Sequence, residues 1–276
     1  MSRSPTDVRA ALARTLRRMG GRSPQRVACL QPDGILSWDS VKRTTSELPA
    51  TARFEHFDAW CTTNEGCDAR LFVSGHLVHS LLIDPALHIV DEEAMHAYAL
   101  QQFTHYHGAA ARKWPLAVWA DGPQSFACAL HALDLDEMRA SAARHNVRLR
   151  SLAPLWSAGL GSLSIRVPAL TDAGMRAFAL VEGSLVTWLV VDAGRLHAIQ
   201  RRFLDAPRVD ALSTLIGQLV AEGHLLADLP IVIGWGLHDA EPGADFTSKL
   251  RARVIGSLNG DGPGAEWVLD AVRTVA

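Results

Sequence analysis

Three glycine turns follow apolar runs in the sequence, and two of them carry a carboxylate. They read Val181-Glu182-Gly183-Ser184, Asp192-Ala193-Gly194 and Gly234-Trp235-Gly236. Glycine lets backbone N–H groups approach a bound anion closely, because no side chain stands in the way. Carboxylate oxygens are the ligands that Mg²⁺ prefers. These residue types could hold an anion and a divalent cation, so their positions in the fold decide whether that chemistry is available.

The 12 histidines do not supply a complete set of metal ligands at a suitable spacing. On a helix, His105 and His107 would point about 200° apart. On a strand, His76 and His79 would face opposite sides of the sheet. Because a structural zinc site needs four converging ligands, we expect polar histidines here and no metal site.

No serine or cysteine has the neighbours that a catalytic nucleophile needs. The segment 157–161 contains serine and two glycines but lacks the Gly-x-Ser-x-Gly pattern. Cys128 lies inside the apolar run 126–130, which predicts a buried and unreactive thiol. The run 234–239 has Asp239 where a dinucleotide-binding loop has its third glycine. We therefore expect no catalytic residue.

The composition is that of a folded globular protein. The chain has 276 residues, 48% of them hydrophobic, and a formal net charge of -2. This length corresponds to about two structural units, and the near-neutral charge argues against nucleic acid as the main partner. Four cysteines without metal-binding spacing favour a reducing compartment. With no secretory signal and no apolar stretch long enough to span a membrane, we expect a cytoplasmic protein.

Residues 1–26 form a basic N-terminal extension. Val8, Leu12, Leu16 and Met19 recur at helical spacing, and Gly20-Gly21 ends the pattern. A short basic amphipathic helix of this kind is either a mobile or locally docked tail, or a contact with a membrane surface or a partner.

Residues 27–159 form the first predicted lobe. A hairpin is expected over 27–38, around the turn Pro32-Asp33-Gly34. A second strand–turn–strand pattern covers 71–83, and the polar stretch 40–68 has no clear pattern. Further along, the periodicity predicts helices over 91–107 and 134–144 and strands over 116–120, 126–130 and 147–152.

Residues 160–276 form the second predicted lobe and repeat this order of elements. The patterns predict strands over 175–181, 185–191, 196–203 and 229–233, and helices over 209–222 and 265–275. Each half thus contains a strand meander, a helix and a further strand, which indicates an internal repeat.

Two such halves with glycine turns at corresponding places resemble the actin-like fold. This fold is a duplicated, ribonuclease H-like α/β architecture of two lobes, each with a mixed sheet and flanking helices. Within it, the chain resembles the degenerate cytoplasmic proteins of type IV pilus and type II secretion inner-membrane platforms. The segments that carry the resemblance are 71–84, 114–159, 178–204 and 231–236.

The resemblance implies where a nucleotide would bind. An active actin-like ATPase holds phosphates with two Asp-x-Gly hairpins and admits adenosine at a Gly-Gly turn. The corresponding hairpins are expected at 73–76, which has no carboxylate, and at 181–184. Trp235 interrupts the adenosine-like turn. The Asp192-x-Gly194 turn joins the second and third strands of its lobe, whereas a phosphate hairpin joins the first and second, so an ordinary turn is expected there.

We therefore expect no cofactor and a non-catalytic scaffold. The resemblance implies that it binds cytoplasmic segments of an envelope-assembly machine at the inner face of the inner membrane, on a small subdomain of the first lobe. The first alternative is a nucleotide-binding actin-like ATPase, and the second is an unrelated α/β enzyme. Under the first alternative, ATP and Mg²⁺ would be held by Glu182, Gly183, Ser184, Asp192, Gly194, Gly234 and Gly236.

Overall fold

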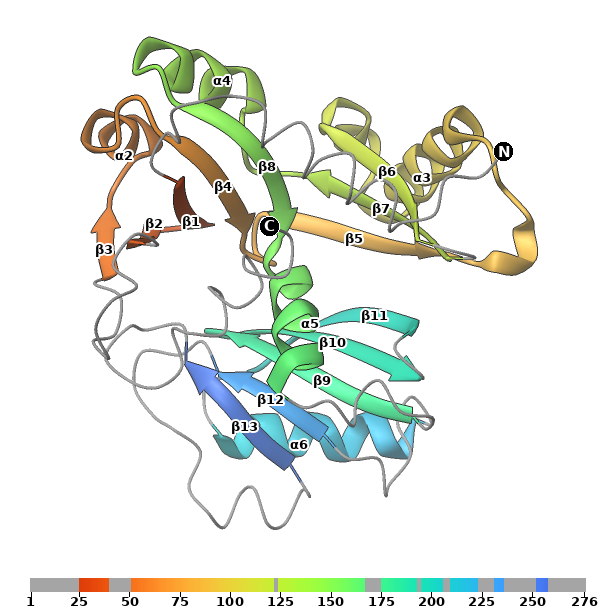
Figure 1. The fold of residues 1–276 in the computed structure, drawn as a ribbon. Coiled ribbons are helices and arrows are strands. Elements are labelled where there is room, and N and C mark those ends of the chain that lie inside the picture. The colour runs from red at the N-terminus through yellow and green to blue at the C-terminus, as the bar shows by residue number, and fades with distance from the viewer. Residues whose placement is uncertain are drawn as a thin grey trace. The chain divides into compact units, whose positions relative to one another are not determined.

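The computed structural model divides the chain into two compact units (Figure 1). The described residues are 25–39, 51–121, 124–166, 175–192, 195–205, 209–222, 231–235 and 252–257. The first unit holds 25–39 and 52–154, and the second holds the described residues from Leu155 onward. The helices predicted before residue 24 and over 265–275 lie outside the described residues. The lobe boundary at 159/160 stays a prediction.

A five-stranded sheet forms the frame of the first unit, in the order β3-β2-β1-β4-β8. β1 is antiparallel to β2 and parallel to β4, and β4 is parallel to β8. The middle of the central strand β1 is apolar and buried on both faces, and Val27, Ala28 and Cys29 are fully buried. The strands are β1 Gln25–Gln31, β2 Gly34–Asp39, β3 Thr51–Phe54, β4 Asp68–Val73 and β8 Arg148–Pro154.

The second unit has a five-stranded sheet with the same strand order. Its order is β11-β10-β9-β12-β13, so that in both sheets the first strand lies between the second and the fourth. β9 is antiparallel to β10 and parallel to β12, as β1 is to β2 and β4. The internal repeat predicted from the sequence is therefore confirmed. The strands are β9 Met175–Glu182, β10 Leu185–Asp192, β11 Arg195–Phe203, β12 Ile231–Trp235 and β13 Ala252–Ser257.

Helix α6, Val209–Ala221, covers one face of the second sheet. Its buried residues Leu212, Leu215 and Leu219 recur at helical spacing, and they pack against alternate residues of β9 such as Ala177 and Ala179. The other helices are α2 Phe57–Thr63, α3 Glu92–His107, α4 Leu135–Arg144 and α5 Leu155–Arg166, with short 3-10 helices η1 Pro85–Leu87 and η2 Ala109–Lys113.

A separate three-stranded sheet is inserted between β4 and α4 (Figure 1). Its antiparallel strands are β5 Val78–Ile83, β7 Gln124–Leu130 and β6 Leu116–Asp121, with β7 in the middle. Helix α3 packs on one face through Ala99 and Phe103, which contact Ala127 and Ala129 of β7. The insertion of residues 78–130 therefore has a small core of its own.

The hairpin predicted over 71–83 is wrong, although both of its strands exist. β4 ends at Val73 in the five-stranded sheet, and β5 begins at Val78 in the inserted sheet. The intervening turn therefore carries the chain from one sheet to the other. The sequence cannot show this, because the same turn residues occur whether the two flanking strands pair with each other or belong to different sheets. The first hairpin of the fold is instead β1–β2, with the turn Pro32-Asp33.

A polar cluster holds α2 against α4, and both helices belong to the first unit. The Asp58 carboxylate accepts hydrogen bonds from Ser141 Oγ and Arg144 Nη2, each at 2.6 Å. His145 Nε2 lies 3.4 Å from the same oxygen. The Ser141 hydroxyl, the Arg144 guanidinium and the ring of His145 lower the pKa of Asp58 from 3.8 to about 2, against a small opposing effect of desolvation.

We expect Asp58 to contribute to stability at neutral pH and not in strong acid. Its folded-state pKa lies below its unfolded value, so its contribution is complete above about pH 4 and is lost as the pH falls towards 2. In Asp58→Asn the loss of stability between pH 5 and pH 2.5 should therefore be smaller than in the unchanged protein, and Ser141→Ala should shift it in the same direction. Urea unfolding at the two pH values measures this. If either variant loses as much stability between them as the unchanged protein does, the assignment is wrong.

Candidate functional site

In each five-stranded sheet, one hairpin joins the first strand to the second. The resemblance to actin-like ATPases implies that carboxylates at these two hairpins would approach the phosphates of a nucleotide. Both are tight, with Gln31 paired to Gly34 in the first and Glu182 paired to Leu185 in the second. Each hairpin therefore has a two-residue turn, and each carries one carboxylate, Asp33 or Glu182. The sequence pattern predicts the first hairpin at 73–76, which leaves out Asp33.

The Asp33 carboxylate is paired within its own sheet. It accepts a hydrogen bond from Arg53 Nη2 of β3. Gly34 follows with a φ of +138°, and a Cβ atom at this position would collide with the carbonyl oxygen of Phe54. Gly34 is thus required for the close approach of β3. This packing explains the glycine without any need for a bound phosphate.

Gly34→Ala should destabilise the protein by about 2 to 3 kcal/mol, because the new side chain meets both a strained φ and the carbonyl of Phe54. Gly217 in α6 is the matched control, since nothing lies within 4 Å of a Cβ there. Gly217→Ala should stabilise the helix by about 0.5 to 1 kcal/mol. Chemical denaturation of both variants tests the pair, and equal effects would show that β3 does not constrain the turn.

The Glu182 carboxylate is also beside an arginine of its own sheet. Glu182 is buried, with 7% of its surface exposed. Burial lowers the pKa of Arg201 on β11, and the negative charge of Glu182 acts in the opposite direction. The turn is held further by the N–H of Leu204, which donates to the carbonyl of Ser184 at 2.7 Å. Each hairpin carboxylate therefore interacts electrostatically with an arginine from the third strand of its sheet, Asp33 with Arg53 and Glu182 with Arg201.

Of the other predicted nucleotide-binding residues, Gly183 and Ser184 form the turn of the β9–β10 hairpin, whereas Asp192 and Gly234 lie elsewhere in the sheet. Asp192 ends β10 and pairs with Arg195 at the start of β11. The intervening turn therefore joins the second and third strands of the sheet, as predicted from the sequence. Gly234 lies within β12. Gly194 and Gly236 lie outside the described residues. Gly183 has a φ of +62° in the β9–β10 turn, a conformation that glycine adopts readily.

Histidines come together in the inserted sheet, although not the ones that are neighbours in the sequence. The ring of His79 lies 3.9 Å from that of His107 and 4.3 Å from that of His131, centroid to centroid, and Trp114 packs at 5.2 Å. Among the described residues, no group of three or more histidine, cysteine or acidic side chains is arranged to hold a metal ion. His79 stacks on Trp114, and the rings of His107 and His131 are tilted against it, so these contacts are ring packing.

Cys128 is a buried thiol, as its apolar sequence neighbours predict. It lies on β7, and burial raises its pKa to about 12, against a smaller opposing effect of the Ser80 hydroxyl 3.2 Å away. A thiol with such a pKa is protonated at neutral pH and is a poor nucleophile.

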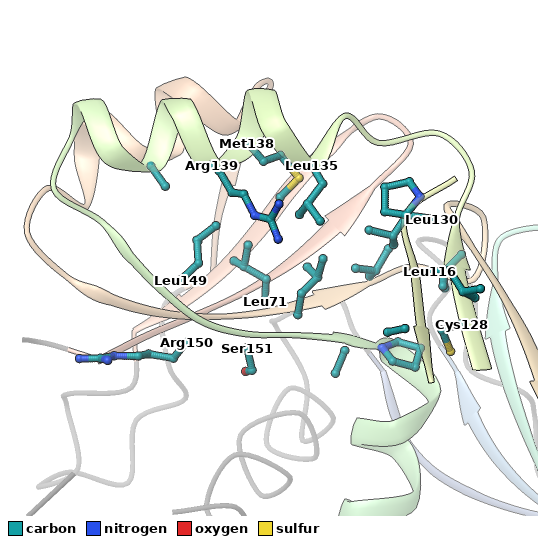
Figure 2. A pocket seen from close by; sticks show the side chains of 18 of the residues that line it. Leu71, Leu116, Cys128, Leu130, Leu135, Met138, Arg139, Leu149, Arg150 and Ser151 are labelled. Atoms are coloured by element: carbon teal, nitrogen blue, oxygen red, sulfur yellow. The ribbon is translucent and has the colours of Figure 1, made fainter. Parts of the chain in front are cut away.

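The first unit contains an apolar groove of about 540 Å³ (Figure 2). It lies between the inserted sheet on one side and α4, β4 and β8 on the other. We call it the insertion groove. Its lining residues are Leu71, Val73, Val78, Pro115, Leu116, Ala117, Cys128, Leu130, Leu135, Met138, Arg139, Ala142, Ala143, Val147, Leu149, Arg150, Ser151, Leu152, Ala153 and Pro154.

The inserted sheet turns the face opposite α3 towards the groove. Ala117 of β6 and Cys128 of β7 are directly paired, as are Val78 of β5 and Leu130 of β7, and all four residues line the groove. Successive strand residues point to opposite faces, so Ala127 and Ala129 pack under α3 instead. One face of this small sheet is thus used for its own core, and the other is left for the groove.

The opposite wall is built by α4 and the strand that follows it. Leu135, Met138 and Ala142 lie on one side of α4 at a spacing of three and four residues, and Figure 2 shows Leu135 and Met138 pointing into the groove. β8 contributes six consecutive residues, 149–154, to the lining. The groove therefore follows the length of this strand.

The charged residues of the lining are both arginines. Figure 2 shows Arg139 projecting from α4 into the groove, while Arg150 extends away from it along β8. Arg150 Nη2 lies 3.0 Å from Asp68 Oδ2, and Arg148 Nε pairs with the other oxygen of the same carboxylate at 2.6 Å. Arg139 is 64% exposed and pairs with Asp136, 3.2 Å away on the same helix. The groove is apolar inside with a cation at its rim.

The residues of this groove cannot be identified from the sequence. The apolar stripe of α4 is visible in the periodicity of the sequence. The opposite wall of the groove belongs to the inserted sheet, which forms only when β6 pairs with β7. No local pattern reports that arrangement.

Comparisons with known proteins show the fold. No protein-family model and no curated protein matches the chain. Among solved structures, a Bacteroides thetaiotaomicron protein with an actin-like ATPase fold and unknown function matches 91% of this chain and 95% of its own, with a TM-score of 0.59 and 8% identity. The chain therefore has the actin-like fold, which excludes the alternative of an unrelated α/β enzyme.

Two further structures of this fold come from envelope machines. The type IV pilus biogenesis complex PilM–PilN contains a chain that is matched over 100% of its length and 93% of this one, with a TM-score of 0.59 and 11% identity. The cytoplasmic domain of EpsL, an inner-membrane component of the Vibrio cholerae type II secretion system, is matched over 94% of its length and 91% of this chain, with a TM-score of 0.50 and 11% identity. The resemblance stated from the sequence is confirmed at the level of fold.

Among the described residues, none of the helices has both the length and the apolar composition that a membrane span requires.

Proposed function

We propose that the protein is a non-catalytic scaffold that binds an extended segment of a partner protein in the insertion groove. The observation that carries this proposal is the groove itself, which is apolar, open along a strand and about 540 Å³ in volume. Pockets of about 300 to 1,000 Å³ lined by apolar side chains are typical of binding sites. Its lining offers no paired acid and base, because its charged side chains are Arg139 and Arg150.

The comparisons support a partner in an envelope-assembly machine. One similar structure is part of a type IV pilus complex between two proteins, PilM and PilN, and another belongs to an inner-membrane component of a type II secretion system. We propose that this chain likewise works at the cytoplasmic face of the inner membrane and holds a cytoplasmic segment of an assembly component. The basic extension 1–26, of which the structure describes only Gln25 and Arg26 at the start of β1, would suit an anionic membrane surface.

A nucleotide-binding ATPase remains a second candidate, because the first hairpin does contain an aspartate. Asp33-Gly34 lies at the β1–β2 turn, where the fold would bring a carboxylate to a phosphate. Against this candidate, Asp33 is paired with Arg53, and Glu182 is buried beside Arg201. A magnesium ion would have to compete with both arginines, so we favour the scaffold and propose that it needs no cofactor.

Site-specific photo-crosslinking in the native host tests the scaffold. A benzophenone amino acid is placed at Ala117, which is exposed and lines the groove, or at Ala120, which is exposed on the same strand and does not line it. We expect position 117 to crosslink to a cytoplasmic segment of an inner-membrane protein, identified by mass spectrometry, and position 120 not to do so. The absence of a crosslink at 117, or equal crosslinking at both positions, would overturn the proposal.

A further inference from the structure

We propose that the outer side of helix α3 is an interface through which two copies of this chain pair about a two-fold axis, with the two α3 helices antiparallel. This interface does not depend on the proposed function, because α3 packs on the face of the inserted sheet that is opposite the groove. A dimer formed in this way would keep both insertion grooves outside its interface.

The first observation is that α3 has an exposed side without formal charge. Met95, Ala99 and Phe103, spaced by four residues, form its buried side. Ala97 and Gln101 lie on the opposite side of the helix and are exposed. None of the residues 94–111 is aspartate, glutamate, lysine or arginine. The water-facing side of a helix normally carries charges, and interfaces are depleted of them, so this composition indicates a contact with another molecule.

The second observation is that large apolar side chains are exposed at both ends of this helix. Val90, just before the N-cap, is 91% exposed, and Tyr106 in the last turn is 70% exposed. Leu87 is exposed in the segment that leads into the helix. Among the described residues, the fourth exposed large apolar side chain is Phe203, in the second unit. An association that covers the ends of α3 would remove this apolar surface from water.

The charges that flank α3 are opposite in sign at its two ends, which identifies a second copy as the occupant. Glu92 and Glu93 lie in the first turn and are exposed. Arg112 and Lys113, also exposed, lie beyond the C-terminal end on η2, which packs against α3. When two copies of α3 lie antiparallel about a two-fold axis, the acidic end of each meets the basic end of the other.

A parallel arrangement would bring like charges together, because the two acidic ends would meet and the two basic ends would meet. The antiparallel arrangement also directs Val90 of each copy towards the end of the other copy that carries Tyr106, so the same apolar contact forms twice. A helix of 16 residues is about 24 Å long, which makes a small interface. We therefore expect a weak dimer with a dissociation constant of about 10 µM.

Exchange of the charges between the two ends tests this arrangement. One variant of the full chain carries Glu92→Lys and Glu93→Lys, and the other carries Arg112→Glu and Lys113→Glu. In sedimentation velocity, each variant alone should self-associate at least about 10-fold more weakly than the unchanged protein, because both contacts between ends become repulsive. An equimolar mixture should form a heterodimer about as tight as the unchanged dimer, because both contacts are again between opposite charges. A variant that had lost its fold would not be rescued by mixing.

Val90→Ser tests the apolar contribution and should weaken the dimer about 10-fold. Phe203→Ser is the matched control, since it removes an exposed apolar side chain from the second unit, and it should leave the dimer unchanged. The proposal would be overturned if the unchanged protein stayed monomeric up to about 100 µM. It would also be overturned if the mixture of charge variants failed to restore the dimer, or if Phe203→Ser weakened it as much as Val90→Ser does.

Discussion

Ala117→Trp should weaken binding of the partner segment by at least about 100-fold, which corresponds to about 2.7 kcal/mol. Ala117 is exposed on β6 and its methyl group lines the insertion groove, so an indole in its place would occupy the volume that the segment needs. Tryptophan is well accepted in strands, and the fold should be kept. The measurement is fluorescence anisotropy of a labelled peptide with the sequence of the crosslinked segment.

Ala120→Trp is the control for this substitution. Ala120 lies three residues further along the same strand, is exposed and does not line the groove, so its variant carries the same new side chain on the other face of the sheet. It should bind as the unchanged protein does. Equal binding by both variants would place the partner elsewhere, and equal weakening would show that the effect comes from a disturbed strand.

Magnesium and ATP should bind with a dissociation constant weaker than about 1 mM, about a thousand times weaker than a micromolar nucleotide-binding protein. Asp33 forms an ion pair with Arg53, and Glu182 is buried and interacts electrostatically with Arg201, so a hydrated magnesium ion would meet an arginine's positive charge at each carboxylate. Titration calorimetry of the full chain with ATP and Mg²⁺ measures this directly.

A micromolar affinity would support the ATPase instead, and three variants would then locate the site. Loss of binding in Asp33→Ala or Glu182→Ala would assign the phosphates to the first-to-second-strand hairpins. Loss in Asp192→Ala would assign them to the β10–β11 turn, which the strand register argues against.

The elements that could be predicted from the sequence are those whose ends carry their own signals. α3 was expected from residue 91, and Asp91 is its N-cap, accepting a hydrogen bond from the N–H of Ala94 at 2.8 Å. The β9–β10–β11 meander was expected from its two glycine turns and forms with the predicted register. In both cases the deciding interactions join residues close together in the chain.

The parts that were missed depend on distant residues. β3 has four residues and α2 seven, and α2 contains Trp60, whose indole N–H donates to Ser37 on β2 at 2.9 Å. Such short elements have too few positions to show a period, and they are fixed by contacts across the unit. The groove was missed for the same reason, because Ala117 and Met138 become neighbours only through the pairing of β6 with β7.

Two adjacent chain segments connect the inserted sheet to the rest of the first unit. The chain leaves β4 at Val73 and returns towards α4 after Leu130, and the N–H of His131 donates to the carbonyl of Leu77 where the two crossings meet. Because residues 78–130 carry a core of their own around Phe103, this block can accumulate mutations without loosening the frame. Substitutions in this block should therefore change one wall of the groove and leave the strand pairing of the five-stranded sheet intact.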